Sequence, residues 1–191
     1  MTHSDIIARI CAAAPVIPVL TIDRVEDAQP LARALVAGGL PALEITLRTD
    51  AALEAIAAIA EVEGAMPGVG TLLTALQVKN AKAAGATFGV SPGSTPALIS
   101  ATQEFDLPLL PGAATATEAM SLLEQGFIFQ KFFPAEAAGG TSALGSLAGP
   151  LPMITFCPTG GITPQNAKTY LALPNTLCVG GSWIAPKALV A

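Results

Sequence analysis

A lysine surrounded by aromatic residues is the side chain in this sequence with the clearest chemical potential. Lys131 follows Phe129 and is followed directly by Phe132 and Phe133. In a buried strand an ammonium group loses its hydration, which favours the neutral amine, and a neutral amine can attack a carbonyl carbon. Lys131 is therefore a candidate nucleophile. The alternative is a lysine that extends to the edge of the sheet or pairs with a carboxylate.

A carboxylate and a guanidinium occur together in a second apolar segment. Glu44 lies inside Ala42–Leu47, and Arg48 follows it at two strand periods, so the two side chains would share one face of a strand. If that face points inward, a carboxylate close to an amine can relay protons. A purely structural ion pair of Glu44 with Arg48 or Lys131 is the alternative.

Glycine pairs follow the last two apolar segments. Gly160 and Gly161 come after one, and Gly180 and Gly181 with Ser182 come after the other. Backbone N–H groups of such turns can approach an anion closely, and loops at these positions bind phosphate in many barrel enzymes. A phosphate-binding site is expected there. Other candidates at segment ends, either as hydroxyl donors or as apolar pocket walls, are Thr71, Pro92, Phe133 and Thr159.

These residues must be positioned by short apolar segments, most of which lack period-2 alternation. That pattern is typical of strands buried on both faces of a parallel sheet. The predicted strands are Val16–Leu20, Ala42–Leu47, Ala65–Gly70, Thr87–Ser91, Leu107–Pro111, Ile128–Phe133, Met153–Cys157 and Thr176–Gly180. Between them lie segments of helical spacing: Val25–Ala37, Ala51–Val62, Leu76–Ala84, Thr95–Glu104, Thr115–Gln125 and Pro164–Leu171.

Eight strand–helix units in one chain predict a (β/α)₈ TIM barrel formed by a single domain, residues 1–191. An extra helix, Asp5–Ala13, precedes the first strand. The eighth helix is predicted to be missing or truncated, because only Trp183–Ala191 follows the last strand. A doubly wound open sheet is the runner-up, although no G-x-G-x-x-G motif follows the first strand.

Composition excludes several classes of protein. Hydrophobic residues make up 52% and charged residues 12% of the 191 residues, and the formal net charge is −5, which argues against disorder and against electrostatic binding of nucleic acid. No apolar run is long enough for a membrane span, and no signal-peptide pattern is present. The single histidine, His3, lies in a terminus expected to be frayed, and the three cysteines are widely spaced. We therefore expect no metal, no cofactor and a cytoplasmic location.

Taken together, these segments resemble the 2-keto-3-deoxy-6-phosphogluconate (KDPG) aldolase family, which also cleaves 4-hydroxy-2-oxoglutarate (KHG). The segments that carry the resemblance are Leu43–Thr49, Gly70–Thr71, Ser91–Gly93, Lys131–Glu136, Phe156–Gly161 and Gly180–Trp183. The runs Lys-Phe-Phe-Pro-Ala-Glu and Cys-Pro-Thr-Gly-Gly are specific to this family. The resemblance extends from about Ile6 to Pro186.

The resemblance implies a metal-free class I aldolase of the Entner–Doudoroff pathway, a lyase acting on a keto-acid phosphate and usually a homotrimer. It makes Lys131 the Schiff-base lysine and Glu44 the general acid/base. It assigns Arg48 and Thr71 to the pyruvate carboxylate, and Thr159 to stereochemistry at the new carbinol. The phosphate-site residues that it implies are Gly160, Gly161, Gly181 and Ser182. Glu136 is expected to be a surface group and Tyr170 to pack.

Two departures from the family pattern leave alternatives open. Family members continue for about one more helix beyond Trp183, and Pro67 lies inside a predicted central strand. An engineered or shortened aldolase barrel that serves as a scaffold or assembly subunit is therefore one alternative. Another sugar-phosphate enzyme, such as an isomerase or synthase, is a second. Phosphogluconate-, galactonate- and hydroxyglutarate-type substrates share the keto-acid half and remain open.

Overall fold

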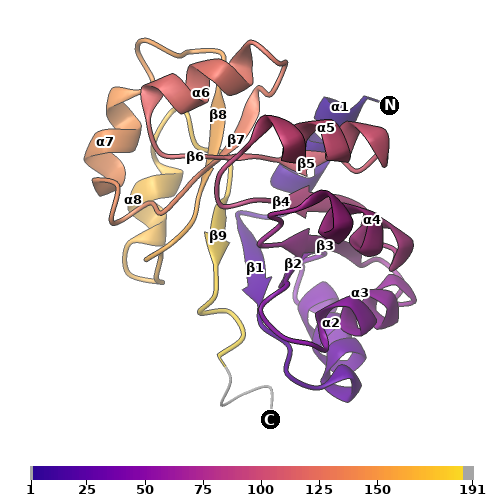
Figure 1. The fold of residues 1–191 in the computed structure, drawn as a ribbon. Helices are drawn as coiled ribbons and strands as arrows, with labels where there is room; N and C mark the ends of the chain where they lie inside the picture. The colour runs from indigo at the N-terminus through magenta and orange to yellow at the C-terminus, as the bar shows by residue number, and fades with distance from the viewer. Residues whose placement is uncertain (1, 187–191) are drawn as a thin grey trace.

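The computed structural model describes residues 2–186, which form an α/β fold built on curled parallel sheets (Figure 1). One sheet has the strand order β5-β4-β3-β2-β1-β9 and the other the order β6-β7-β8, with every paired strand parallel. The strands are β1 Val16–Leu20, β2 Ala42–Thr46, β3 Met66–Gly70, β4 Phe88–Val90, β5 Leu109–Leu110, β6 Gly112–Ala113, β7 Phe129–Phe132, β8 Thr155–Pro158 and β9 Val179–Gly181.

The fifth predicted strand is divided into β5 and β6 at Pro111. Proline has no N–H to donate to a neighbouring strand, so the regular ladder is interrupted there. The carbonyl of Pro111 still accepts a hydrogen bond from Lys131 N at 2.8 Å. At the other edge of the three-stranded sheet, isolated parallel bridges join Phe156 to Thr176 and Thr159 to Gly180. These bridges connect β8 with the segment that contains β9.

An apolar cluster packs on the inner face of the curled sheets. It consists of side chains from alternate strand positions and from the first helix: Ile7, Ile10, Cys11, Ile17, Ala42, Phe88, Val90, Leu110, Cys157 and Cys178. Ala42 belongs to this cluster and Phe129 packs against it. Glu44 lies two residues after Ala42, and Lys131 lies two residues after Phe129, so both side chains face the same interior. The helix His3–Ala12 (α1) contributes three members and faces the first residues of β5 and β7, so it covers the amino ends of these strands.

The remaining helices lie outside the sheets, as Figure 1 shows, and a second, larger apolar cluster fills the space between helices and strands. These helices are η1 Val25–Asp27, α2 Ala28–Ala37, α3 Ala52–Ala60, α4 Ala75–Ala83, α5 Pro96–Glu104, α6 Ala116–Leu123, α7 Gly140–Ser146 and α8 Ala167–Leu171. Helix α7 was not predicted. Its sequence, GTSALGS, contains two glycines and a single buried residue, Leu144, so it carries no apolar periodicity.

The expectation for His3 needs correction, whereas the strand predicted around Pro67 is present as β3. His3 does not lie in a frayed terminus: it begins α1, Thr2 and Asp5 form a capping box, and His3 Nε2 lies 2.8 Å from Asp106 Oδ1. Pro67 fits within β3, where its carbonyl accepts from Thr87 N at 2.8 Å. The nitrogen of Pro67 faces the same neighbouring segment, at a level that comes before β4 begins at Phe88. The missing N–H therefore interrupts no pairing between β3 and β4.

The predicted loss of an eighth barrel helix involves residues 187–191, which lie outside the described part of the chain. Between residues 2 and 186, no helix is both long and apolar enough to cross a membrane.

Candidate active site

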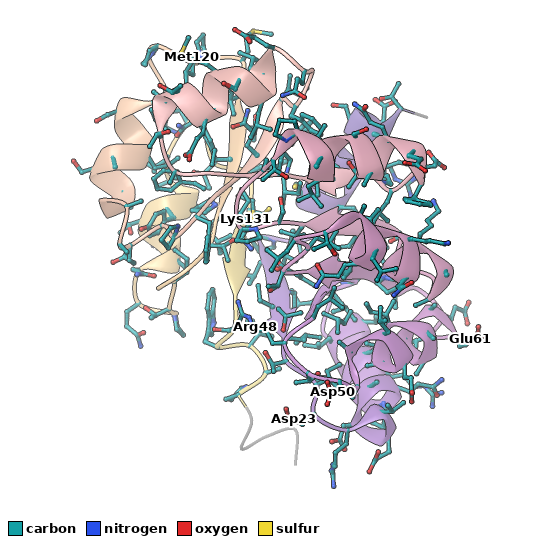
Figure 2. All side chains as sticks on the ribbon, in the orientation of Figure 1. Asp23, Arg48, Asp50, Glu61, Met120 and Lys131 are labelled. Atoms are coloured by element: carbon teal, nitrogen blue, oxygen red, sulfur yellow. The ribbon has the colours of Figure 1, made fainter. Side chains whose placement is uncertain are left out.

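The centre of the site is a buried ion pair between the two sheets. Lys131 projects from β7 and Glu44 from β2, and Lys131 Nζ lies 3.4 Å from Glu44 Oε1. Their side chains are only 6% and 4% exposed. The Lys131 ammonium also lies 5.0 Å from the centre of the Phe133 ring. Figure 2 shows Lys131 in the middle of the molecule. The structure thus brings together the amine and the carboxylate that the sequence singled out.

A strand glycine makes room for the Glu44 side chain. Gly70 ends β3 beside β2, and a Cβ atom placed on it would lie 2.4 Å from Glu44 Oε1 and 2.7 Å from its Cγ. Real Cβ atoms do not approach so closely, so a residue larger than glycine here must displace the carboxylate. Sequence reasoning missed this role, although a glycine inside a strand often indicates a close approach by a neighbouring group.

We expect Gly70→Ala to lower kcat about 100-fold, because displacement of a reacting group by about 1 Å has an effect of that order. Steady-state kinetics with the substrate proposed below measures it, and circular dichroism checks the fold. Gly93→Ala is the matched control, since a Cβ atom on Gly93 meets nothing within 4 Å. Equal kinetics of the two variants would contradict the role of Gly70.

The end of β3 carries backbone strain. Thr71 has φ +61°, a left-handed conformation that is costly for a β-branched residue. Such residues persist where the surrounding structure holds them, often at ligand sites. Leu47 N donates to Gly70 O at 3.0 Å, so the segments that follow β2 and β3 lie side by side and bring Arg48 to the neighbourhood of Thr71.

The expectation that Arg48 lies on a strand is wrong. β2 ends at Thr46, and Arg48 is an exposed residue of the turn that follows. Figure 2 places it at the end of the molecule toward which β1 and β9 point, beyond Lys131. Arg48 is therefore at the mouth of the site, where water can solvate its guanidinium group.

The segment after β8 forms a turn of two glycines that packs against Phe133, since a Cβ atom on Gly160 would lie 3.2 Å from the Phe133 ring. Thr159 is 7% exposed, and its Oγ1 lies 4.0 Å from Cys157 Sγ. Gly160 and Gly161 have φ values of +98° and +78°, which favour glycine. Among the described residues, no acceptor receives a hydrogen bond from the N–H groups of Gly161 and Ile162. These two donors can therefore bind an anion.

The other residues that the sequence predicts to line the site lie at or just after the ends of strands. Gly181 ends β9, and its face is covered by the Trp183 ring, since a Cβ atom there would lie 2.1 Å from Trp183 Cζ3. Ser182 is exposed next to it. The backbone of Pro92 packs against Gly112, where a Cβ atom would lie 2.3 Å from the Pro92 carbonyl oxygen.

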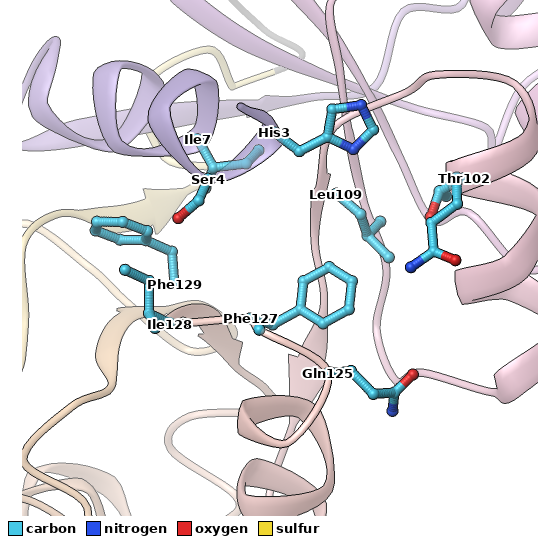
Figure 3. Close-up of a pocket in the computed structure, with 11 residues that line it drawn as sticks. His3, Ser4, Ile7, Thr102, Leu109, Gln125, Phe127, Ile128 and Phe129 are labelled. Atoms are coloured by element: carbon cyan, nitrogen blue, oxygen red, sulfur yellow. The ribbon is translucent and has the colours of Figure 1, made fainter. Parts of the chain in front are cut away.

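A cavity lies at the opposite end of the strands and is separate from the ion pair. It has a volume of about 130 Å³, and α1 covers one side of it with His3, Ser4 and Ile7, as Figure 3 shows. Leu109 and Phe129, the first residues of β5 and β7, lie opposite. Among residues 2–186, no group of three or more His, Cys, Asp or Glu side chains could hold a metal ion.

Residues 7–191 match the family described as "KDPG and KHG aldolase". The chain belongs to this aldolase family. A 2-dehydro-3-deoxy-phosphogluconate aldolase of Pseudoalteromonas atlantica is 51% identical over 90% of this chain and 80% of its own length. The KHG/KDPG aldolase of Escherichia coli K12 is 49% identical over 93% of this chain and 84% of its own length.

Two solved structures of this family share the fold. The KDPG aldolase of Zymomonas mobilis ZM4, crystallised with 3-phosphoglycerate, has a TM-score of 0.93 and 50% identity, covering 97% of this chain and 88% of its own. The KDPG aldolase of Legionella pneumophila, with pyruvate captured as a covalent carbinolamine, has a TM-score of 0.91 and 47% identity, covering 95% and 88%.

Proposed function

We propose that this aldolase cleaves 2-keto-3-deoxy-6-phosphogluconate to pyruvate and glyceraldehyde 3-phosphate through a Schiff base on Lys131. The observation that carries the proposal is the buried contact of 3.4 Å between Lys131 Nζ and Glu44 Oε1. An isomerase or a non-catalytic scaffold does not require an amine paired with a carboxylate in an apolar interior. The carbinolamine captured in the Legionella relative supports the same chemistry.

Formation of the imine begins with proton transfer within the pair. One proton passes from the Lys131 ammonium to the Glu44 carboxylate, which leaves a neutral amine and a carboxylic acid. The amine attacks the C2 ketone and gives a carbinolamine. Glu44 then protonates the departing hydroxyl, so water leaves and a positively charged imine forms. The low exposure of both groups favours these transfers over exchange with solvent.

Cleavage follows because the charged imine accepts an electron pair. The C4 hydroxyl loses its proton to the Glu44 carboxylate, its electrons form the aldehyde, and the C3–C4 bond electrons pass to the imine to give an enamine. Glyceraldehyde 3-phosphate leaves. Protonation of the enamine at C3 and hydrolysis of the imine then release pyruvate and restore the Lys131 amine.

The other candidate residues bind the substrate in this proposal. Arg48 and Thr71 hold the pyruvate carboxylate at the mouth of the site, where a guanidinium can make a bidentate contact. Thr159 lies next to the new carbinol and influences its configuration. Phe133 and Pro92 form apolar walls. The phosphate is held by backbone and side-chain donors of Gly160, Gly161, Gly181 and Ser182, and the 3-phosphoglycerate complex of the Zymomonas relative supports a phosphate site in the family.

A covalent trap tests the proposal directly. Incubation with pyruvate and borohydride reduces the imine, and we expect one stable adduct per chain, located on Lys131 by peptide mapping. Pyruvate with the reductant omitted is the control, since the unreduced imine hydrolyses. A folded protein that yields no adduct would sink the proposal. The name of the Escherichia coli relative suggests KHG as a second substrate, with the same adduct.

We also propose that the single domain, residues 1–191, closes as a (β/α)₈ barrel and assembles as a homotrimer in the cytoplasm. Continuity of the chain through Pro111 and the bridge between Thr159 and Gly180 support closure. Leu73 and Leu76 are 56% and 65% exposed and provide apolar surface for an interface. Three buried free thiols are consistent with a reducing compartment.

A further inference from the structure

A buried tyrosine and a carboxylate lie beneath the Gly160-Gly161 turn and take no part in the chemistry proposed above. Tyr170 projects from α8, is fully buried, and its hydroxyl donates to Glu136 Oε1. Glu136 follows β7 and is otherwise exposed. A carboxylate beside an anion site opposes anion binding through charge repulsion. The packing of the turn gives a structural reason for the presence of the Glu136 carboxylate at this position.

The stem of the Glu136 side chain packs directly on Gly161. A Cβ atom on Gly161 would lie 2.6 Å from Glu136 Cγ and 2.7 Å from its Cβ, so the two residues are in close contact. The backbones are joined as well, since Glu136 N donates to Gly160 O at 3.1 Å and Ala135 N donates to Thr159 O at 2.8 Å. A change in the position of Glu136 must therefore move the turn.

The far side of the turn is held by Asn166. Its Nδ2 donates to Gly161 O at 3.1 Å, and its Oδ1 accepts from Thr163 N at 2.8 Å. Because a trans peptide points its C=O and N–H in opposite directions, anchoring Gly161 O orients the N–H of Ile162 away from Asn166. The orientation of the free donors thus depends on Asn166 on one side and on Glu136 on the other.

We propose that Tyr170 and Glu136 are positioning residues for the phosphate end of the substrate. The tyrosine hydroxyl fixes the Glu136 side chain, and the stem of that side chain fixes Gly161 so that its N–H and that of Ile162 meet the phosphoryl oxygens. This inference rests on the proposed function, because a phosphorylated aldol is the ligand that the turn receives.

The state of the tyrosine supports this role. Burial, together with the hydrogen bond to Glu136, raises the pKa of the Tyr170 phenol. The hydroxyl therefore keeps its proton and remains a donor at neutral pH. The same hydrogen bond engages one carboxylate oxygen, which reduces the charge that Glu136 presents to a bound phosphate.

Comparison of two substrates separates positioning from general damage. KDPG carries a phosphate, whereas KHG does not, and both use the same keto-acid chemistry. We expect Tyr170→Phe, which removes one hydroxyl and keeps the ring, to raise KM for KDPG about tenfold and to leave kcat within twofold. KM and kcat for KHG should remain within twofold of wild type. Equal rises in KM for both substrates would overturn the proposal.

Variants of the exposed partner keep the test independent of damage to the core. Glu136→Ala removes the stem that packs on Gly161 and should reproduce the effect of Tyr170→Phe. Glu136→Gln keeps both the stem and an acceptor for Tyr170, so its KM for KDPG should stay within about twofold of wild type. Thr102→Val, which removes another buried hydroxyl on α5, is the control for hydroxyl loss alone. A wild-type KM in Glu136→Ala would contradict the role of this residue.

A binding measurement separates this inference from the proposed function. Calorimetric titration with glycerol 3-phosphate needs no turnover, and we expect Kd to rise about tenfold in Tyr170→Phe and in Glu136→Ala. If the wild type binds this probe more tightly than both variants but forms no adduct with pyruvate, the proposed function fails and the positioning role stands. If the probe binds wild type and both variants equally, or fails to bind wild type, the positioning role fails.

Discussion

Lys131→Met will lower kcat/KM for KDPG cleavage by about 10⁵-fold or more, the order of loss that follows removal of a covalent nucleophile. Methionine is close to lysine in length and lacks the amine, so imine formation and every later step stop. The apolar interior accepts methionine readily, because the neighbours of Lys131 include Phe133 and the strand residue Cys157. The variant should therefore fold and remain inactive.

A coupled assay of pyruvate release measures this loss. The protein concentration used in the assay sets the upper limit that can be placed on the residual activity. Lys79→Met is the matched control, since Lys79 is exposed on α4 and its loss should leave kcat/KM within twofold of wild type. The pyruvate and borohydride treatment should add mass to the control and none to Lys131→Met. If Lys131→Met were folded and retained more than about one hundredth of the wild-type turnover, the amine would not be the nucleophile and an acid–base isomerase would become the better reading.

The parts of this fold that the sequence predicted are those encoded locally. Strands such as Val16–Leu20 are continuous β-branched and apolar runs, and the observed β1 has the same bounds. Lys131 and Glu44 could be selected because a charge inside such a run has no solvent to account for it. The two residues are 87 positions apart in the sequence. Their contact was expected if both side chains face the same interior, and the structure confirms this contact.

The parts that were missed depend on where neighbouring elements begin and end. Arg48 has the spacing of a strand residue, but β2 stops at Thr46, so its place on the inner face was predicted wrongly. Helix α7 has weak local preference and forms where the chain must return from β7 to β8. The contact between Glu136 and Tyr170 joins residues 34 positions apart, and neither has a sequence neighbourhood that indicates a partner.

The second large effect concerns the proton relay. Glu44→Gln should lower kcat for KDPG about 10³-fold, within the range that general acid–base catalysis supplies. The amide occupies almost the same volume beside Gly70, so the fold and the position of Lys131 should persist. It cannot take a proton from the Lys131 ammonium, and it cannot donate one to the carbinolamine hydroxyl. Loss of water from the carbinolamine then becomes slow, while attack on C2 remains possible whenever the amine is neutral.

The step affected distinguishes a relay from a structural partner. If Glu44 relays protons, the borohydride adduct on Lys131 should still form in Glu44→Gln, with a rate reduced in proportion to kcat, because the reductant traps imine and not carbinolamine. If Glu44 only pairs with the Lys131 charge, its loss should lower the free energy of unfolding and leave the rate of adduct formation unchanged. Glu54→Gln, on the exposed face of α3, controls for loss of a carboxylate. Among residues 2–186, Glu44 is the one carboxylate within ion-pair distance of Lys131, with Oε1 3.4 Å from Nζ, so the first outcome is the one that the geometry favours.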